Sequence, residues 1–251
     1  MTNIILRGCN GKMGQVITEI VEADEKAVIV AGVDIYQNRM NKYPVYQSFT
    51  KCNVKADVII DFSSPNNMEE MLDFAVKRGI GIILCTTGLS KEQMIVIEEA
   101  AKVIPIFQSA NMSMGVNLIS KLLKQAAVVL TEAGFDIEIV EKHHNRKVDA
   151  PSGTALALAD AMNEALNHEY DYKFDRSQDR VMREKKEIGI SAVRGGTIVG
   201  EHEVIFAGTD EVIEIKHTAY SKAVFAKGAV QAAKYLSGKP AGKYNMSDVM
   251  D

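Results

Sequence analysis

The first half of the chain alternates short apolar runs with longer segments in which apolar residues recur every three or four positions. The short runs indicate buried strands at residues 3–7, 27–33, 56–62, 80–84 and 104–107. The segments between them indicate amphipathic helices at 12–23, at a stretch following residue 62, and at 90–103. Alternation of this kind is typical of a parallel sheet with helices packed on its faces.

Capping residues predict where two of these helices begin. The Ser-Ser-Pro sequence at 63–65 is typical of a helix cap and first turn, and Gly79 of the end of that helix. Ser90 and Gln93 form a capping-box pair, which predicts that the next helix starts at this serine.

From Asn111 onward, strands and helices no longer alternate regularly. Helices are predicted at 116–131, 152–166 and 223–235, and strands at 136–141, 188–193, 197–207 and 211–218. A charged stretch at 169–187 is predicted to be a flexible surface segment without chemistry. Consecutive strands without helices between them suggest a partly antiparallel sheet. We therefore predict an α/β fold: a Rossmann-like parallel sheet domain plus a second α+β domain with a mixed sheet.

Composition and charge narrow the class of protein. The 251 residues carry a net charge of −4, with acids and bases mixed, so no basic face predicts nucleic-acid binding. The longest apolar run, 28–33, is far shorter than the roughly 20 residues of a membrane span. The first residues enter a strand with no charged leader, and Cys9, Cys52 and Cys85 lack metal-ligand spacing. We expect a cytoplasmic protein with reduced thiols.

A glycine-rich turn follows the first predicted strand and opens the first helix. Its sequence from Gly8 to Gly14 is G-x-x-G-x-x-G, in which glycine lets backbone N–H groups approach a pyrophosphate. Asp34 ends the second strand 20 residues after the last glycine, where an acid holds the ribose hydroxyls of a dinucleotide. The alternative is a plain glycine-rich turn with an aspartate facing solvent.

The highest concentration of side chains that could act in catalysis or binding lies at residues 141–155, around the start of a predicted helix. Two of the five histidines, His143 and His144, are adjacent there, and Lys147 follows. A helix N-terminus near Ser152 offers backbone N–H groups to a carboxylate or a phosphate. Histidines and a lysine around such a site predict binding of an acidic substrate and proton delivery near neutral pH.

Other interpretations of these residues stay open. Adjacent histidines on an extended segment point in opposite directions and no third ligand is near, which disfavours a metal. One histidine could pack in the core while Lys147 is merely solvated. A serine hydrolase is disfavoured because Ser152 lacks the nucleophile-elbow pattern. Cys85 could be an aldehyde dehydrogenase nucleophile, although its strand-end position is more typical of a small buried residue.

The motifs resemble those of the dihydrodipicolinate reductases, NAD(P)H-dependent enzymes of the diaminopimelate route to lysine. Residues 141–155 match the family signature E-x-H-H-x-x-K-x-D-A-P-S-G-T-A throughout, and the glycine turn resembles its G-x-x-G-[RK]-M-G. Residues 194–196, 199–202 and 225–229 match further family motifs. The resemblance covers nearly the whole chain.

The resemblance implies a division of labour along the chain. Residues 1–112 and 222–251 would bind the dinucleotide, and 113–221 would bind substrate and form the oligomer, a homotetramer. NADH and/or NADPH would be held by Gly8, Cys9, Asn10, Gly11, Lys12, Met13, Asp34, Cys85, Thr86, Thr87, Ser109, Ala110, Asn111 and Met112. The catalytic pair would be His143 and Lys147. The carboxylates of a small dicarboxylate substrate, 4-hydroxy-tetrahydrodipicolinate, would meet His144, Lys147, Gly153 and Thr154.

Three positions depart from the family pattern and concern cofactor preference and domain closure. Many members have arginine where this chain has Ile35, which removes a cation that could reach an NADPH 2′-phosphate. Met112 replaces a common phenylalanine, and Lys222 replaces a common arginine. Two rival functions remain: a semialdehyde dehydrogenase that uses Cys85, and a sensor that binds the dinucleotide without turnover.

Overall fold

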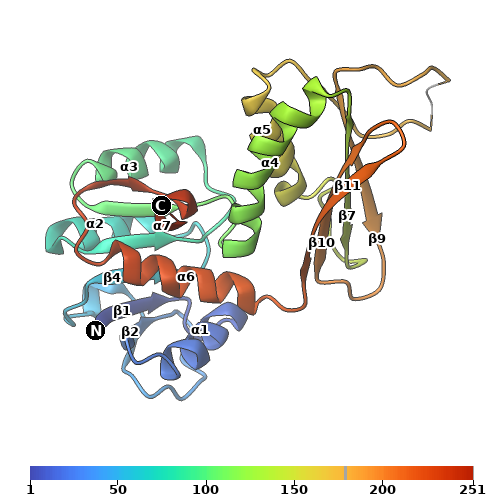
Figure 1. Cartoon of the computed structure of the whole chain (residues 1–251). Coiled ribbons are helices and arrows are strands. Elements are labelled where there is room, and N and C mark those ends of the chain that lie inside the picture. The colour runs from blue at the N-terminus through green and yellow to red at the C-terminus, as the bar shows by residue number, and fades with distance from the viewer. Residues whose placement is uncertain (178–179, 251) are drawn as a thin grey trace. The chain divides into compact units, whose positions relative to one another are not determined.

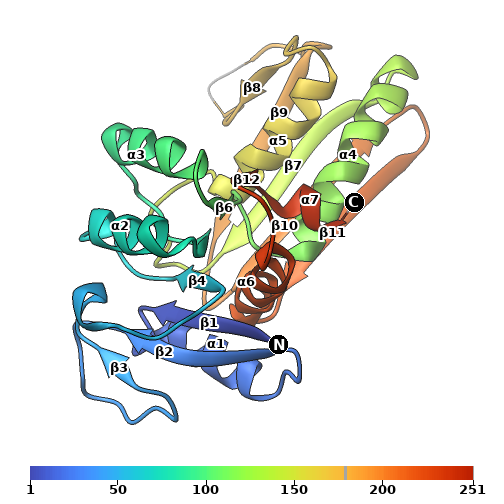
Figure 2. The same cartoon turned by 90° about the vertical axis from the view of Figure 1, so that its left-hand side faces the viewer.

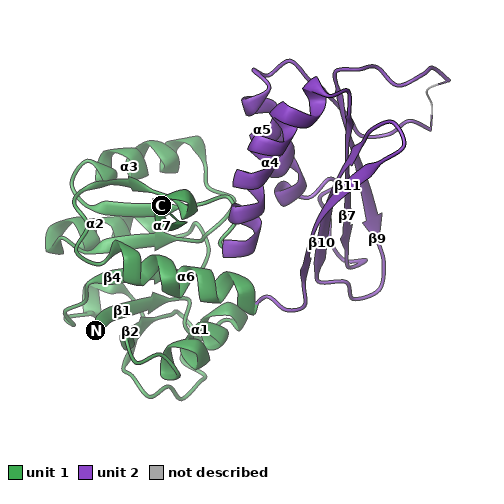
Figure 3. Ribbon diagram, viewed as in Figure 1, with its two compact units in different colours: residues 1–113, 223–251 green, residues 114–222 purple. Residues whose placement is uncertain are grey.

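The computed structural model describes residues 1–177 and 180–250 (Figure 1). It divides into two compact units: residues 1–113 with 223–251, and residues 114–222 (Figure 3). Among the described residues, no helix is both long enough and apolar enough to cross a membrane.

Unit 1 is built on a parallel sheet of seven strands in the order β12-β6-β5-β4-β1-β2-β3. The strands are β1 Thr2–Arg7, β2 Ala27–Val33, β3 Val45–Tyr46, β4 Val58–Asp61, β5 Gly81–Leu84, β6 Pro105–Gln108 and β12 Gly242–Tyr244. Every residue of β4 and β5 is buried, as expected for central strands covered on both faces.

Helices cover both faces of this sheet (Figure 2). Helices α1 (Lys12–Glu22) and α6 (Ala223–Leu236) pack on one face, and α2 (Met68–Arg78) and α3 (Lys91–Ala101) on the other. Helix α6 comes from the end of the chain and approaches the backbone after β6 closely. A Cβ atom at Gly228 would lie 1.7 Å from the Met112 carbonyl oxygen, so only glycine fits there. A 3-10 helix (Phe49–Lys51) and α7 (Met246–Met250) complete the unit.

The strand order creates a crevice at one edge of the sheet. From β1 the chain continues to β2 and β3 on one side, and then returns to β4 on the other side. The carboxyl ends of β1, β2 and β4 therefore meet where the direction of winding reverses. This is the place at which open α/β sheets bind ligands.

Unit 2 is a five-stranded mixed sheet in the order β11-β10-β7-β9-β8. The strands are β7 Asp136–His143, β8 Asp171–Lys173, β9 Glu187–Arg194, β10 Gly200–Ala207 and β11 Val212–Ala219. Strand β10 is antiparallel to both neighbours, whereas β7 and β9 are parallel. Helices α4 (Met114–Glu132) and α5 (Gly153–Ala165) cover one face, so buried and partly exposed residues alternate along β7 and β10 (Figure 1).

The structure confirms the predicted strands and the Ser90 capping box, and it corrects the predicted start of α2. This helix begins at Met68, not at 63–65, and its N-cap Asn67 has a left-handed backbone with φ of 56°. The guanidinium of Arg7 donates to the Asn66 carbonyl oxygen. The residues read as a helix cap therefore belong to a turn anchored at the carboxyl edge of the sheet.

The charged stretch at 169–187 is predicted to be a flexible surface segment; its described residues lie mostly at the surface, but they include one strand that was not predicted. Strand β8 pairs with β9. Arg183 donates to Asp136 at 2.8 Å, to Glu138 at 3.1 Å and to three backbone carbonyls. Charge alone does not predict such order, because the acidic partners lie 45 and 47 residues away in sequence. Residues 178 and 179 of this stretch lie outside the described residues.

Candidate functional site

The glycine turn of unit 1 connects β1 to α1 with backbone packed too closely for side chains. Gly8 has φ of +79°, and a Cβ atom there would lie 2.4 Å from the Phe62 carbonyl oxygen. A Cβ at Gly14 would lie 2.2 Å from the Gly8 carbonyl oxygen. The N-cap of α1 is Gly11, which has no side chain to accept hydrogen bonds from the N–H groups of the first turn. This geometry fits a pyrophosphate bound by backbone at a helix N-terminus.

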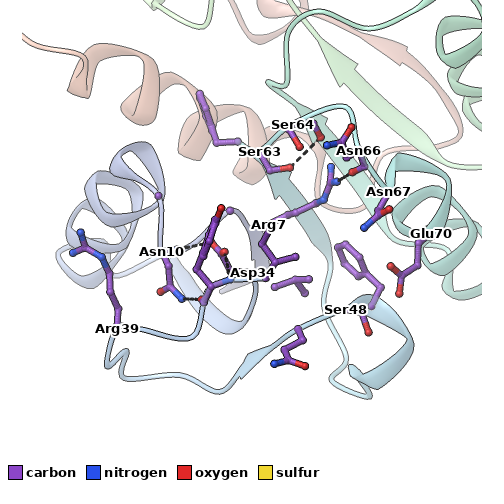
Figure 4. A pocket seen from close by; sticks show the side chains of 18 of the residues that line it. Arg7, Asn10, Asp34, Arg39, Ser48, Ser63, Ser64, Asn66, Asn67 and Glu70 are labelled. Atoms are coloured by element: carbon purple, nitrogen blue, oxygen red, sulfur yellow. Dashed lines mark hydrogen bonds between the residues drawn. The ribbon is translucent and has the colours of Figure 1, made fainter.

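Asp34 follows β2 and lies beside the turn. Its Oδ2 accepts the Asn10 N–H at 2.9 Å, and its Oδ1 accepts the Tyr36 N–H at 2.9 Å (Figure 4). The Asn10 side chain donates to the Tyr36 carbonyl oxygen. A carboxylate has about four acceptor positions, so two remain for the hydroxyls of a ribose.

A pocket of about 800 Å³ opens at the carboxyl ends of β1, β2 and β4. Four predicted cofactor residues line it: Gly8, Asn10, Gly11 and Asp34. Its size is typical of sites for drug-sized and cofactor ligands. The opposite wall is formed by the turn at 63–67 and by Glu70 (Figure 4). These residues fit the adenosine half of a dinucleotide.

The charges of this pocket bear on cofactor choice. Ile35 is 67% exposed at the rim and supplies no cation. Arg39 is exposed and lines the same pocket (Figure 4). Arg7 also lines it, but its guanidinium is engaged by Asp61 at 3.1 Å and by the Asn66 carbonyl oxygen.

Other residues predicted to bind the cofactor lie in or beside the turn without lining the pocket. The Cys9 side chain is fully buried, and burial raises the pKa of its thiol to about 12. Its Sγ would lie 2.5 Å from a Cβ at Gly32, so it packs in the core, and only the backbone of Cys9 can face a ligand. Lys12 and Met13 form the first turn of α1, where the lysine is exposed.

Two further predicted segments follow β5 and β6 at the same edge of the sheet. Residues 85–87 come after β5, and Thr86 is buried, with its Oγ1 accepting the Ser63 N–H at 3.2 Å. Residues 109–112 come after β6, and Asn111 Oδ1 accepts the Ser113 N–H at 2.8 Å. Neither segment lines the 800 Å³ pocket, so the pocket contains only part of the predicted cofactor set.

In unit 2, strand β7 carries an acid and a histidine on its helix-covered face. Glu141 and His143 are two residues apart, so both point inward with Ile137 and Ile139. The Glu141 side chain is completely buried and accepts four hydrogen bonds. Arg194 Nη1 and Nη2 donate at 2.7 Å each, His143 Nδ1 lies at 2.7 Å, and the Ser152 N–H donates at 2.9 Å.

The charge of Glu141 is stabilised despite its burial. Burial by itself raises the pKa of the carboxyl group. The hydrogen bonds from Arg194, His143 and the Ser152 backbone outweigh it, so the pKa lies below its usual value. An ionised carboxylate only accepts hydrogen bonds, so His143 Nδ1 must donate. Nε2 is then the ring nitrogen at which a proton can be exchanged.

The N-terminus of α5 lies next to this carboxylate. Its N-cap, Ser152, accepts the Ala155 N–H at 3.1 Å through Oγ, which lies 2.9 Å from His202 Nε2. Burial lowers the pKa of His202 to about 4, so its ring is neutral and shares a hydrogen bond with the serine hydroxyl. Gly153 and Thr154, predicted to bind substrate, are the first two residues of the helix.

Lys147 lies in the loop between β7 and α5 and holds an acid of the same loop. Its Nζ donates to both oxygens of Asp149, at 2.8 and 2.9 Å. These bonds, and to a smaller extent the Gly153 N–H, lower the pKa of Asp149. A carboxylate of the protein itself therefore occupies a position where cation and helix N-terminus converge. His144 is half-buried, and its Nδ1 has no hydrogen-bond partner among the described residues.

The motif analysis did not assign roles to three residues that hold this cluster together: Glu141, Arg194 and His202. The signal for Glu141 was present, because an acid at a buried position of an alternating strand needs a partner. Nothing local predicts Arg194 or His202, which meet Glu141 only through strand pairing. Arg194 is opposite His143 in the β7–β9 pair, and His202 is opposite Glu141 in the β7–β10 pair.

Comparison with known families gives matches to both parts of the chain. The model described as "Dihydrodipicolinate reductase, N-terminus" matches residues 2–112. The model described as "Dihydrodipicolinate reductase, C-terminus" matches residues 115–250.

Curated proteins named 4-hydroxy-tetrahydrodipicolinate reductase are similar over the full length. The protein of Clostridium novyi (strain NT) is 50% identical over 100% of this chain and 98% of its own. That of Caldanaerobacter subterraneus subsp. tengcongensis is also 50% identical, with the same coverage.

Among solved structures, a dipicolinate-bound dihydrodipicolinate reductase from Paenisporosarcina sp. TG-14 has the same fold. Its TM-score is 0.81 at 23% identity, covering 98% of this chain and 97% of the other. A probable dehydrogenase from Thermotoga maritima shares the fold more distantly, with a TM-score of 0.60 at 13% identity. The motifs, the two sheets and the matched residues agree: this chain belongs to the dihydrodipicolinate reductase family of NAD(P)H-dependent oxidoreductases.

Proposed function

We propose that this protein reduces 4-hydroxy-tetrahydrodipicolinate in the diaminopimelate route to lysine. The substrate, NAD(P)H and a proton give tetrahydrodipicolinate, NAD(P)⁺ and water. The observation that carries the proposal is a histidine bound to a buried carboxylate beside a lysine and a helix N-terminus, in a chain of this family. That combination suits a doubly negative substrate that must receive a proton.

The cofactor site is proposed to lie on unit 1. The backbone of residues 8–13 binds the pyrophosphate, and Asp34 accepts the adenine-ribose hydroxyls. The remaining cofactor residues are those that follow β5 and β6: Cys85, Thr86, Thr87, Ser109, Ala110, Asn111 and Met112. When bound, NADH or NADPH supplies the hydride that reduces the substrate ring.

The substrate site is proposed to lie at the N-terminus of α5. Lys147, His144, Gly153 and Thr154 bind the two substrate carboxylates. Support comes from Asp149, whose carboxylate already shows how an anion is accepted between the Lys147 ammonium and the start of the helix. A substrate carboxylate replaces that of Asp149 without leaving the lysine unpaired.

Proton transfer is proposed for His143 and Lys147. In the protonated imidazole, Nδ1–H stays hydrogen-bonded to Glu141, and the Nε2 proton passes to a carbon of the reduced substrate ring. The electron pair of the broken N–H bond stays on Nε2, while the C=C pair of the ring forms the new C–H bond and the lone pair of the ring nitrogen forms C=N. Solvent then restores the proton on Nε2. Lys147, with three N–H donors, holds the substrate and acts as a second proton donor.

The two rival functions have less support. Burial raises the pKa of Cys85 well above its usual value, and Asp61 adds to the effect. A protonated, half-buried thiol is a poor nucleophile, which disfavours a Cys85-dependent dehydrogenase. A sensor without turnover would not need the hydrogen bonds that fix His143.

We also propose a cytoplasmic homotetramer assembled through unit 2. The face of its sheet that α4 and α5 leave uncovered carries apolar side chains, among them Val140, Val193, Ile205 and Val212. Val193 is 44% exposed and Val212 is 57% exposed. These side chains are interspersed with charged ones on the same face, such as Glu138, Lys142 and Glu203, so the support for a tetramer comes from the resemblance to the family. The cysteines are unpaired, in keeping with a reducing compartment.

The proposed activity is tested by NADH oxidation in the presence of substrate generated by its synthase. Wild type should turn over, whereas His143→Ala and Lys147→Ala should lose on the order of 10²–10⁴-fold in kcat, because a positioned acid is removed. Dinucleotide binding, followed by fluorescence titration, should stay normal. Lys124→Ala, which removes a surface lysine of unit 2, is the control. Near-normal kcat in either site variant removes the role assigned to it, and no wild-type turnover removes the reductase.

A planar dicarboxylate such as pyridine-2,6-dicarboxylate should inhibit in competition with substrate. Thr154→Ala should weaken this inhibition by about 1–3 kcal/mol, because a charged acceptor loses one hydrogen bond. Inhibition constants are measured at one ionic strength, since salt screens the charge. Thr131→Ala, at the far end of α4, should leave them unchanged. Equal inhibition of wild type and Thr154→Ala would place the anion site elsewhere.

NADH should serve at least as well as NADPH. A 2′-phosphate would lie beside the Asp34 carboxylate, and Ile35 offers no cation against the repulsion. The kcat/KM values of the two cofactors are compared at one ionic strength. A preference for NADPH above about tenfold, or 1.4 kcal/mol, contradicts the argument. Arg39→Ala then shows whether this pocket arginine had supplied the missing cation.

Sedimentation should give a mass of about 110 kDa, four times the 27.5 kDa of the chain. Val193→Asp should lower that mass, because it replaces an exposed apolar side chain of that face by a charged one. Val103→Asp places the same charge at an exposed valine of unit 1 and should not change it. A monomeric wild type, or a tetramer that tolerates Val193→Asp, argues against this interface.

A further inference from the structure

We infer that Glu141, clamped by Arg194, is a positioning residue that fixes the tautomer of His143 and orients its ring for proton donation. This inference rests on the proposed role of His143. It assigns to an acid outside the predicted site a function that is exerted through another residue.

The carboxylate of Glu141 has no freedom to move. Each of its oxygens accepts two hydrogen bonds: Oε1 from Arg194 and Ser152, and Oε2 from Arg194 and His143. The two N–H groups of a planar guanidinium fix the plane of the carboxylate. The direction of the bond to His143 Nδ1 is therefore set before any ligand arrives.

The sheet fixes the other end of the same bond. The His143 carbonyl oxygen accepts the Gly195 N–H at 2.9 Å, and Arg194 Nη2 also donates to the Asp149 carbonyl oxygen at 2.6 Å. On the Nε2 side, a Cβ at Gly200 would lie 3.1 Å from the ring nitrogen, so glycine leaves that nitrogen uncrowded. The ring thus has one nitrogen bound to the protein and one left for proton exchange.

Charged and titratable groups approach His143 from every element around it. Glu141 is on its own strand, Arg194 on β9, His202 on β10 and Lys147 and Asp149 in the following loop, while His217 on β11 lies opposite His202. Of these, only Glu141 accepts a hydrogen bond from the His143 ring among the described residues. In general, an anion hydrogen-bonded to an imidazole ring stabilises the protonated form of that ring, which is why Glu141→Gln tests the bond.

A purely structural role for Glu141 makes different predictions. If the carboxylate only anchored Arg194 and the start of α5, its loss would lower stability without changing the protonation of His143. A positioning role requires three effects: a change of tautomer, a shifted pH profile, and no further loss when His143 is already absent.

The decisive variant is Glu141→Gln, which keeps the shape and removes the charge. We expect kcat to fall on the order of 10²–10⁴-fold with little change in KM; in the Ser-His-Asp triad the comparable asparagine change costs about 10⁴. The alkaline limb of kcat should move to lower pH, because the imidazolium has lost its anion. Nitrogen NMR of labelled histidine should show His143 with Nδ1 protonated in wild type and a mixture of tautomers in the variant.

Two controls separate positioning from damage to the fold. Glu201→Gln makes the same change on β10, where the glutamate pairs with Lys216 on the partly exposed face, and should leave kcat, pH profile and tautomer unchanged. The double variant Glu141→Gln with His143→Ala should be no slower than His143→Ala alone, because the two residues act as one unit.

Several results would overturn the inference. The first is a wild-type NMR spectrum in which neutral His143 carries its proton on Nε2. This result needs no variant, so it can be obtained even if Glu141→Gln fails to fold. The second is a double variant whose loss of kcat is the sum of the two single losses in free energy. The third is a Glu141→Gln variant in which both the pH profile and the His143 tautomer are unchanged. Normal turnover of His143→Ala, by contrast, removes the proposed proton donor itself, which distinguishes failure of the proposed function from failure of this inference.

Discussion

The buried charge of Glu141 is the constraint on which the rest of unit 2 depends. A carboxylate removed from water costs several kcal/mol unless it is paired and hydrogen-bonded, and losing one partner of such a pair typically costs about 3–5 kcal/mol. Its four hydrogen bonds come from β9, from β7 itself and from the start of α5. A slip of either strand would separate these groups and leave the charge unpaired. Strand register, helix start and histidine tautomer are therefore set together, and the proposed chemistry uses the same atoms that enforce the fold.

The two units offer different groups to an anionic ligand. In unit 1 the glycine turn offers backbone at the start of α1, and Asp34 is held in place by the N–H groups of Asn10 and Tyr36. Such a site suits a ligand with phosphates at one end and neutral hydroxyls at the other. In unit 2 the helix N-terminus is joined by Lys147, which suits concentrated negative charge. The Asp34 carboxylate is suited to accept hydrogen bonds from hydroxyls, and the Lys147 ammonium is suited to donate to carboxylates.

The sequence predicts most of what is encoded locally and little of what is encoded by strand pairing. Apolar runs predicted nine of the twelve strands in the described residues and missed the short strands β3, β8 and β12. The glycine turn and the histidine-lysine loop identified two stretches of chain as candidate sites. The start of α2 was predicted wrongly because Ser63 and Pro65 resemble a cap, while Arg7 from β1 holds that segment as a turn. The contact between Arg194 and Glu141 spans 53 residues, and no local pattern indicates it. It exists because parallel pairing of β7 with β9 places Arg194 beside His143.

The loop before α5 also shows how a charged site can be kept without an unpaired charge. Lys147 donates to Asp149, and His202, whose burial lowers its pKa to about 4, stays neutral and is hydrogen-bonded to Ser152. On the proposed function, a substrate carboxylate exchanges with that of Asp149 at Lys147, so one ion pair replaces another. The Lys147–Asp149 pair lies at the surface, with the Asp149 side chain 60% exposed, so water solvates the displaced carboxylate and the exchange changes the free energy of the pair little. The affinity for substrate then depends on how much better a substrate carboxylate fits the helix N-terminus than the Asp149 carboxylate does. Until substrate binds, Asp149 competes for Lys147 and also holds its ammonium group in position.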